Sequence, residues 1–435
     1  MYKCIGFLKA FDKYKSVLFK TGMYNFTKPI AVPSNFTIQG SGAHSTLLKK
    51  ISTDILTPYP SISNPTLNYF RWDDNGPNIP TGSPAPGNMN VKDIQQVDAM
   101  FIIFHEDSNY NYQTVIKNIK IDSNLTAQSK YGIYAPRCGY LNLTNVHIQD
   151  FEVGFFTYNT WMSKIDGITI THTSQDTQAK KNVGFQFKND GSGMGTGTSV
   201  NFTNCFVHSV NYGYNFFGLT YSSLTCCGSD YVRGVAYNFN SCNQITLNAC
   251  ASESFSFDYY TIDNGEIVKH MCAILKFESS IGINVSGFRT YLLYDTSFDD
   301  TNSACIILDD SDVNITSANF DNNIVPVSPN QPIKTFKIII QQSSNLCSSF
   351  LKLPENGNPF VSFSRKLADK KSNWIKLDDL TTVLFNSSET STSVNFPAFA
   401  ASELNNIQIK RQGSIVFNTT DNRLSFYDGT SWINL

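Results

Sequence analysis

The residues best suited to catalysis recur at one position of a repeated unit in the middle of the chain. Four titratable side chains occupy this position, namely Asp176, His208, Asp230 and Glu253. Paired carboxylates cleave glycosidic bonds, because one protonates the leaving oxygen while the other acts as a base or nucleophile. This pattern indicates glycoside chemistry, and the alternative is a solvated turn whose charges do no chemistry.

Two carboxylate spacings follow from this row. Successive strands of a parallel stack lie about 4.8 Å apart. Asp230 and Glu253, one unit apart, are then expected at about 5 Å, near the separation in retaining glycosidases. Asp176 and Asp230, two units apart, are expected at about 9 Å, near the separation in inverting glycosidases. Both pairings remain open from the sequence.

Aromatic and basic residues elsewhere are candidates for binding a sugar chain. They are Trp72, Arg233, Tyr259, Tyr260, Arg289 and Tyr291. The two adjacent tyrosines could stack on sugar rings or pack against the protein itself. The two arginines carry planar guanidinium groups that hold a carboxylate through two hydrogen bonds. With His208 or Tyr291 as the base or acid, the arginines would also suit a lyase that removes a proton next to a uronate carboxylate.

The elements that must position these side chains repeat about every 22 residues. Short segments alternate apolar and other residues with a period of two, which is typical of strands; examples are 153–157, 183–187, 212–216 and 235–239. A second alternating segment follows each of them, and the offset between the two is 8 residues from Phe216 to Leu224 and again from Phe239 to Leu247. Cysteines mark the same period, with intervals of 22 and 23 residues between Cys205, Cys227 and Cys250.

A repeated unit of this length with polar turns predicts an all-β chain folded as a right-handed parallel β-helix. Each coil then buries its inward side chains against the coils on either side. A β-sandwich is the alternative, but it has no reason to keep a constant offset of 8. The titratable row would run along one flank of the helix, where the same alignment also places Gln149, Tyr291 and Asp321. The three cysteines are expected to be stacked core thiols that act as small hydrophobes.

Several stretches resemble known proteins. Residues 17–25 and 28–42, which end in Gly40-Ser41-Gly42, resemble the opening coils of pectate-lyase-like β-helix proteins. The units in 212–250 are similar to bacteriophage tailspikes and to capsule or O-antigen depolymerases. Residues 413–432 resemble a small β-module at the C-termini of phage tail fibres. Together the resemblance covers most of residues 17–325 and 404–435.

The resemblance implies a tailspike-type depolymerase of the virion tail, made in the host cytoplasm and acting at the bacterial cell surface. Such a protein is a homotrimer that binds and cleaves a bacterial surface polysaccharide, here by glycoside hydrolysis. Two alternatives remain: a polysaccharide lyase acting on a uronate-containing glycan, and a non-catalytic glycan-binding protein for receptor recognition. Only about 16 residues precede the predicted helix, where tailspikes usually carry a virion adaptor. The adaptor is therefore expected on another chain, unless this form is truncated or free-standing.

The sequence divides into four parts. Residues 1–16 are amphipathic and are expected to cap the first coil. Residues 17–325 are expected to form the β-helix, with inserted loops at 52–96 and 255–271. Residues 326–403 lose the period and are expected to form a C-terminal β-domain, and residues 404–435 are expected to form a small tail-fibre-like β-module.

Composition argues against other classes of protein. The chain of 435 residues carries 33 Lys+Arg against 35 Asp+Glu, so it lacks the basic excess of a nucleic-acid binder. No apolar run approaches the ~20 residues of a membrane span. Lys9, Asp12 and Lys13 stand where a signal peptide needs apolar residues. The 10 cysteines lack paired CxxC spacing, so no metal site is predicted, and no cofactor is indicated.

Overall fold

The computed structural model describes residues 15–53, 97–103, 111–123, 129–173, 182–188, 197–257, 259–263, 266–295 and 303–320, together with short segments between 324 and 434. Nearly every regular element in these residues is a strand, and the one helix among them is the short α3 (Ala401–Leu404). The predicted cap 1–16 and the predicted loop 52–96 lie almost wholly outside the described residues. The described part contains no helix that is both long and apolar enough to span a membrane.

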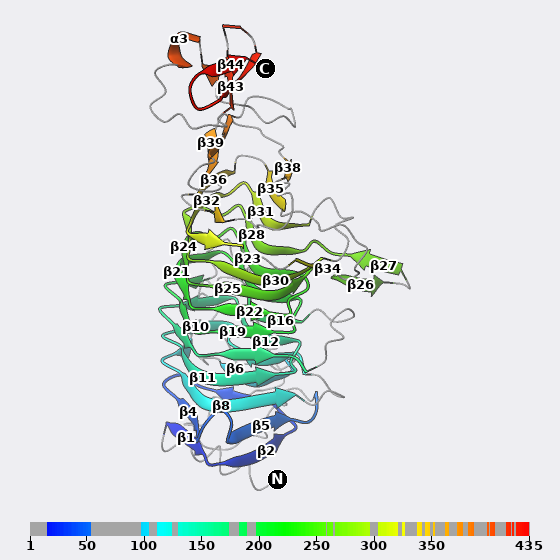
Figure 1. The fold of residues 1–435 in the computed structure, drawn as a ribbon. Coiled ribbons are helices and arrows are strands. Elements are labelled where there is room, and N and C mark those ends of the chain that lie inside the picture. Colours follow the sequence, from blue (N-terminus) through cyan, green and yellow to red (C-terminus); the bar gives the residue numbers. More distant parts are fainter. Residues whose placement is uncertain are drawn as a thin grey trace.

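The strands wind into a parallel β-helix, as the repeat predicts (Figure 1). Pairing between coils divides the helix into three faces. One face is an 11-stranded sheet made of β3 (Ile30–Val32), β6 (Ala99–Ile103), β9 (Tyr131–Tyr134), β12 (Val153–Thr157), β16 (Val183–Phe187), β20 (Tyr212–Phe217), β23 (Val235–Asn240), β28 (Ala273–Glu278), β31 (Ala304–Asp309), β35 (Lys337–Gln341) and β38 (Ser362–Ser364).

The other two faces share one 27-stranded sheet, because long strands such as β8 and β11 contribute to both. The first of these faces contains the starts of β8 (Val115–Ser123) and β11 (Asn142–Gln149), with β1 (Ser16–Phe19), β4 (Thr37–Gly40), β14 (Lys164–Asp166), β18 (Asn201–Thr203), β21 (Leu219–Thr225), β24 (Asn243–Asn248), β29 (Ile283–Ser286), β32 (Asp312–Thr316), β36 (Asn345–Ser348) and β39 (Ser372–Lys376). Short strands lead into it, namely β7 (Asn111–Tyr112), β10 (Arg137–Gly139), β13 (Asn159–Trp161) and β17 (Gly197–Thr198).

The remaining face is called the site face below. It contains the ends of β8 and β11 together with β2 (Gly22–Phe26), β5 (Thr46–Lys50), β15 (Thr169–Thr171), β19 (Phe206–His208), β22 (Gly228–Asp230), β25 (Ala251–Ser256), β30 (Arg289–Asp295), β33 (Ala318–Asn319), β34 (Ile324–Pro326) and β37 (Leu351–Lys352). All of its pairings between coils are parallel, so equivalent residues of successive coils line up along the helix axis.

Side chains of successive coils stack in the interior to form one continuous apolar core. Cys205, Cys227 and Cys250 are buried in it as free thiols, as predicted from their spacing. The Cys250 thiol lies 3.4 Å from the Leu224 carbonyl, and burial raises the pKa of the Cys205 thiol. These cysteines therefore act as small core residues, and the described residues contain no cluster of ligands that could hold a metal ion.

The helix continues beyond residue 325, which corrects the predicted boundary. β35 pairs with β31 in parallel, and β39 pairs in the same way with β36. Among the described strands of the helix itself, only β40 (Thr382–Asn386) pairs antiparallel, with β39. The period is hidden in the sequence because the coils lengthen: Asp312 pairs with Asn345, 33 positions further along the chain.

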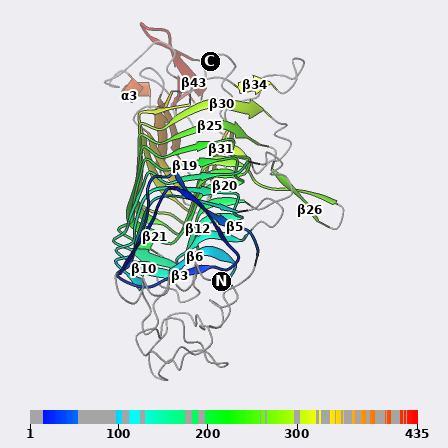
Figure 2. The ribbon, with the colours of Figure 1, turned by 90° about the horizontal axis from the view of Figure 1, so that it is seen from below.

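Two smaller elements interrupt or follow the helix. The predicted insertion at 255–271 contains the antiparallel hairpin of β26 (Tyr260–Asp263) and β27 (Glu266–Lys269), which projects from the body of the helix (Figure 2). Near the C-terminus, a four-stranded sheet contains β41 (Ala398–Phe399), β42 (Ile415–Asn418), β43 (Arg423–Tyr427) and β44 (Trp432–Asn434).

Candidate functional site

Strands β19, β22, β25 and β30 carry the titratable row on the outside of the site face. The parallel register sets His208 opposite Asp230, Asp230 opposite Glu253, and Glu253 opposite Tyr291. Alternation along each strand explains their outward position, because the intervening Ser229 and Ser252 are buried. The alignment of these four residues predicted from the repeat is confirmed.

The position predicted for Asp176 belongs to another residue. Thr171 lies opposite both Gln149 and His208, so it fills the place between them in the row. Asp176 lies outside the described residues. The alignment was wrong here because Ile165, and not the later Ile170, pairs with Leu143 and with Phe202, so the row lies five positions earlier in this coil. The pair of carboxylates two coils apart, which suited an inverting enzyme, is therefore not part of the described row.

Asp230 is held between neighbours on its own coil and the preceding one. His208 Nε2 lies 3.8 Å from Asp230 Oδ2, and His208 Nδ1 is hydrogen-bonded to Ser209 Oγ at 2.9 Å. The exposed ring of Tyr231 stands edge-on to the imidazole, with 5.2 Å between ring centroids. Asp230 Oδ1 is shielded from solvent and has no hydrogen-bond partner among the described residues. The carboxylate thus faces the His208 imidazole at a distance longer than a hydrogen bond, and its other oxygen could still accept one.

A recess of about 260 Å³ lies directly beside Glu253. It is lined by Ala251, Glu253, Arg289, Thr290 and Tyr291. The recess exists because the outward position two places before Glu253 carries only the methyl group of Ala251. Glu253, Arg289 and Tyr291 are exposed around this small residue, so a ligand in the recess meets a carboxylate, a guanidinium group and a phenol.

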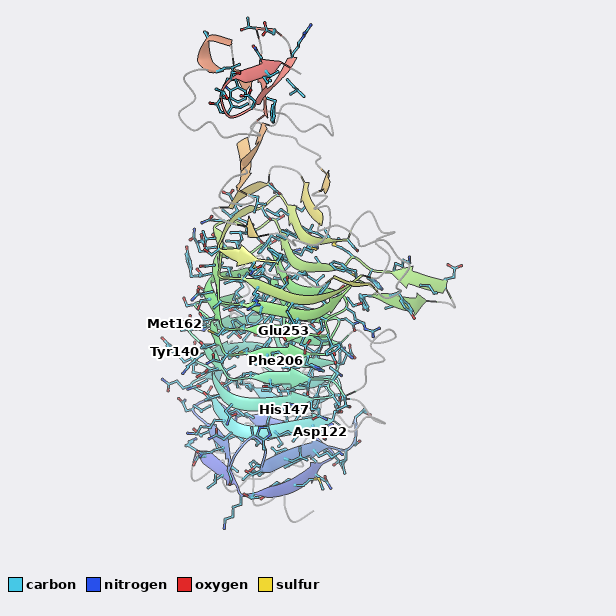
Figure 3. All side chains as sticks on the ribbon, viewed as in Figure 1. Asp122, Tyr140, His147, Met162, Phe206 and Glu253 are labelled. Atoms are coloured by element: carbon cyan, nitrogen blue, oxygen red, sulfur yellow. The ribbon has the colours of Figure 1, made fainter. Side chains whose placement is uncertain are left out.

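One coil earlier, the same outward position is Gly228, and Phe206 fills the space that a larger residue would take. A methyl group at Gly228 would come within 3.0 Å of the Phe206 ring. Phe206 and Glu253 lie on the same face of the helix in Figure 3. An aromatic ring, two positions with little or no side chain and an arginine therefore follow one another beside the carboxylates, along the helix axis.

The predicted binding residues are only partly brought together. Arg289 and Tyr291 line the recess, whereas Arg233 lies in the turn after β22, where its backbone N–H donates to the Val210 carbonyl. Tyr260 lies in the projecting hairpin, opposite Lys269. Trp72 lies outside the described residues.

Tyr259 is buried, which corrects the suggestion that it stacks on sugars. Its side chain is 2% exposed, and its ring stacks on His270 with 4.6 Å between centroids. Burial raises its pKa to about 12. Tyr259 therefore packs against the protein itself, which is the alternative given from the sequence.

Sequence reasoning missed Phe206, Tyr231 and the two small residues of the site. The alternation along the strands could have revealed them, because Phe206 and Gly228 each lie two positions before a residue of the titratable row and so also point outward. It also missed a second polar group in earlier coils of the site face, with Asp122 in the titratable row and His147 in the row of Phe206, both labelled in Figure 3. Burial raises the pKa of Asp122, which lies opposite Gln149.

The fold and this outer row define a parallel β-helix protein with titratable side chains and a small recess on one face. No family model matches the sequence, and no curated protein matches it. Among solved structures, the gp42 tailspike of Acinetobacter phage vb_AbaP_AS12 is similar with a TM-score of 0.58 and 13% identity, over 96% of this chain and 71% of the tailspike.

Two further structures are more distant. The surface protein and adhesin PfbA of Streptococcus pneumoniae has a TM-score of 0.44 and 9% identity, over 81% of this chain and 89% of the adhesin. The GH87 α-1,3-glucanase of Streptomyces thermodiastaticus has a TM-score of 0.38 and 11% identity, over 83% of this chain and 64% of the glucanase catalytic unit. The chain is thus similar in fold to a phage tailspike.

Proposed function

We propose that the protein binds a bacterial surface polysaccharide, a capsule or an O-antigen, along the site face and cleaves it by glycoside hydrolysis. The observation that carries this proposal is the pairing of Asp230 with Glu253 in register, on the outside of adjacent coils and beside a recess. Adjacent coils bring their backbones to about 4.8 Å, which suits carboxyl groups about 5–5.5 Å apart, as in retaining glycosidases.

The two carboxylates take different roles in this proposal. Asp230 faces the His208–Tyr231 ring pair and has one oxygen shielded from solvent, so we assign it as the nucleophile that attacks the sugar ring. Glu253 is exposed at the edge of the recess, where it can protonate the leaving glycosidic oxygen. After the covalent intermediate forms, Glu253 would take a proton from the water that hydrolyses it.

The surroundings of the pair suit a sugar chain. Phe206 and Tyr231 offer ring surfaces, and Arg289 can hold a carboxylate of an acidic sugar through two hydrogen bonds. Likeness of fold to a phage tailspike supports a place in the virion tail, attachment through an adaptor protein and assembly as a homotrimer. Light scattering tests the last of these, because a trimer has three times the 48.6 kDa mass of the chain.

The test is a digest of purified capsular and O-antigen polysaccharides, followed by new reducing ends and by the ultraviolet absorbance of unsaturated uronates. Hydrolysis produces reducing ends without that absorbance. Asp230→Asn and Glu253→Gln should each lower the rate by a factor of about 10² to 10⁴ and keep polysaccharide binding. Asp312→Asn, the same chemical change at an exposed position on another face, should keep full activity.

Other outcomes would replace the proposal. Reducing ends accompanied by the absorbance would indicate a lyase, for which Arg289 and Tyr291 already share the recess. Their substitution, and that of His208, should then abolish cleavage. Binding of a polysaccharide without any cleavage, unchanged in the Asp230→Asn protein, would indicate a receptor-binding protein without catalytic activity.

A further inference from the structure

A group of large side chains lies at a different corner of the helix, where the first face begins. Here one residue in each coil turns the chain with a positive φ, and its N–H donates to a carbonyl of the next coil. Tyr140 and Met162 occupy this position in successive coils and are 44% and 51% exposed. Figure 3 shows both at the margin of the molecule, away from Phe206 and Glu253. The first face separates this corner from the site face.

Gly139 allows aromatic rings to gather beside this turn. Gly139 pairs with Tyr112 of the preceding coil and with Trp161 of the following coil. Because it has no side chain, the rings of Tyr112 and Trp161 meet across it, with 6.1 Å between centroids. A methyl group at this position would come within 2.6 Å of Trp161 Nε1. The Tyr140 ring adds to the group at 5.3 Å from Trp161.

The backbone conformation at this turn disfavours large side chains. Tyr140 and Met162 have φ values of 55° and 46°, a region that bulky residues rarely adopt. The same turn carries polar residues in most other coils, namely Asn35, Gln113, Ser199 and Gln244, and Tyr221 is a further large residue there. Large apolar side chains at these two positions therefore gain nothing from the turn itself, and they extend the ring surface formed by Tyr112 and Trp161.

The size of the group, called the corner patch from here on, argues for a small ligand. The corner patch consists of Tyr112, Tyr140, Trp161 and Met162, and polar turn residues border it in the coils before and after. A stable protein interface needs about 20–30 residues on each side, far more than the corner patch offers. Flat rings bordered by amide and hydroxyl groups fit the apolar faces and the hydroxyl groups of one or two sugar rings.

We infer that the corner patch is a second, non-catalytic binding site for hexose units of a polysaccharide. It goes beyond the proposed catalytic function, since it shares no residue with the Asp230–Glu253 site. Binding at two corners would hold one polymer, or two neighbouring chains, against the helix while the site face acts on one of them. The gain in overall affinity follows from linking two sites on one body.

The test replaces the two large turn residues with asparagine, which tolerates the positive φ of this turn. The double variant Tyr140→Asn, Met162→Asn removes the exposed apolar groups, and asparagine tolerates a positive φ, so folding is expected to be preserved. Affinity for immobilised capsular and O-antigen polysaccharides should fall at least tenfold. Cleavage of oligosaccharides too short to reach the corner patch should be unchanged. Tyr221→Asn is the matched control, because Tyr221 occupies the same turn, is 67% exposed and lies beyond Ser199 from the corner patch.

Two further measurements, fluorescence and light scattering, complete the test. Trp161 fluorescence should change on adding the polysaccharides of the panel, also in the Asp230→Asn protein. Wild-type affinity in the double variant would overturn the inference, and so would the absence of a fluorescence change with every polysaccharide of the panel. A change of oligomeric state in the double variant, seen by light scattering, would show that a second copy of the chain occupies the corner patch. Loss of cleavage in Asp230→Asn concerns the proposed function alone, so failures of the two ideas are distinguishable.

Discussion

The hydroxyl of Tyr237, in the centre of the core, donates a hydrogen bond of 2.8 Å to the carbonyl of Ala251, whose methyl group faces the recess on the outer surface. The same hydroxyl lies 2.9 Å from the Cys227 carbonyl. One coil earlier, Tyr214 contacts the Gly228 carbonyl in the same way, at 3.0 Å. The two tyrosine rings stack with 4.8 Å between centroids. The small residues beside the carboxylates are thus fixed from inside the helix.

Tyr237→Phe should weaken both stability and catalysis. The substitution keeps the ring stack but removes hydrogen bonds to buried carbonyls, which should lower the free energy of unfolding by about 1–3 kcal/mol. The rate of polysaccharide cleavage should fall, because the backbone beneath the recess loses a support. Urea unfolding and initial rates measure the two effects. Tyr221→Phe, which removes an exposed hydroxyl, should change neither; equal behaviour of the two variants would contradict this role of Tyr237.

Ala251→Leu should block the recess without disturbing the core. The larger side chain would point outward into the space between Glu253 and Arg289, so polysaccharide binding should weaken at least tenfold while the unfolding midpoint stays close to that of the wild type. Isothermal titration and thermal unfolding provide the measurements. Thr169→Leu is the control, because Thr169 occupies the same outward position three coils earlier. Unchanged binding in Ala251→Leu would show that the ligand does not enter the recess.

The sequence predicts the fold and the row well because both depend on a regular repeat. Intervals of 22 and 23 residues between stacked cysteines are enough to place Asp230 beside Glu253. The prediction failed for Asp176 because two similar apolar positions, Ile165 and Ile170, could each align with Leu143, and only Ile165 pairs with it. It also failed at residue 325, beyond which longer intervals separate the paired strands.

Other features of the site depend on contacts that a repeat does not encode. Burial of Tyr259 follows from its stacking on His270, which is brought to it by the hairpin. The recess depends on Ala251 being small beside the larger Glu253, Arg289 and Tyr291. An alternating pattern indicates only whether a side chain points inward or outward. It does not show how deeply the side chain is buried or where small residues leave a recess.

Removing one partner of the buried ion pair between Lys50 and Asp98 should destabilise the protein strongly. The Lys50 side chain is fully buried, and its Nζ lies 3.0 Å from Asp98 Oδ1 and donates to the Ser52 carbonyl. Asp98→Ala would remove a carboxylate from contact with a buried ammonium group, so the free energy of unfolding should fall by about 3–5 kcal/mol. Chemical denaturation measures this loss.

The exposed pair of Lys164 with Asp166 is the control for that experiment. Its N–O distance is 3.1 Å, close to that of the buried pair, but 58% of the Lys164 side chain is exposed. Asp166→Ala should therefore cost less than about 1 kcal/mol. Losses of similar size in the two variants would mean that burial does not decide the strength of these pairs.

His147 should make the folded state less stable in acid. Its Nε2 is hydrogen-bonded to Thr171 Oγ1 at 2.9 Å, and burial, with Lys120 and His44 nearby, lowers the pKa of the imidazole from 6.5 to about 4. The unfolded chain therefore binds a proton in the range from about pH 6.5 to pH 4, whereas the folded chain does not. Stability is lost as the pH falls through this window, and His147 costs nothing above it.

His147→Gln should remove this part of the pH dependence. Because the ring is only partly shielded from water, the wild type should lose on the order of 1–2 kcal/mol more than the variant between pH 7 and pH 4. Urea unfolding at several pH values gives the two curves. His44→Gln, which removes an exposed imidazole but keeps His147, should retain most of the wild-type slope. Parallel curves for the wild type and His147→Gln would show that this histidine titrates alike in the folded and unfolded chains.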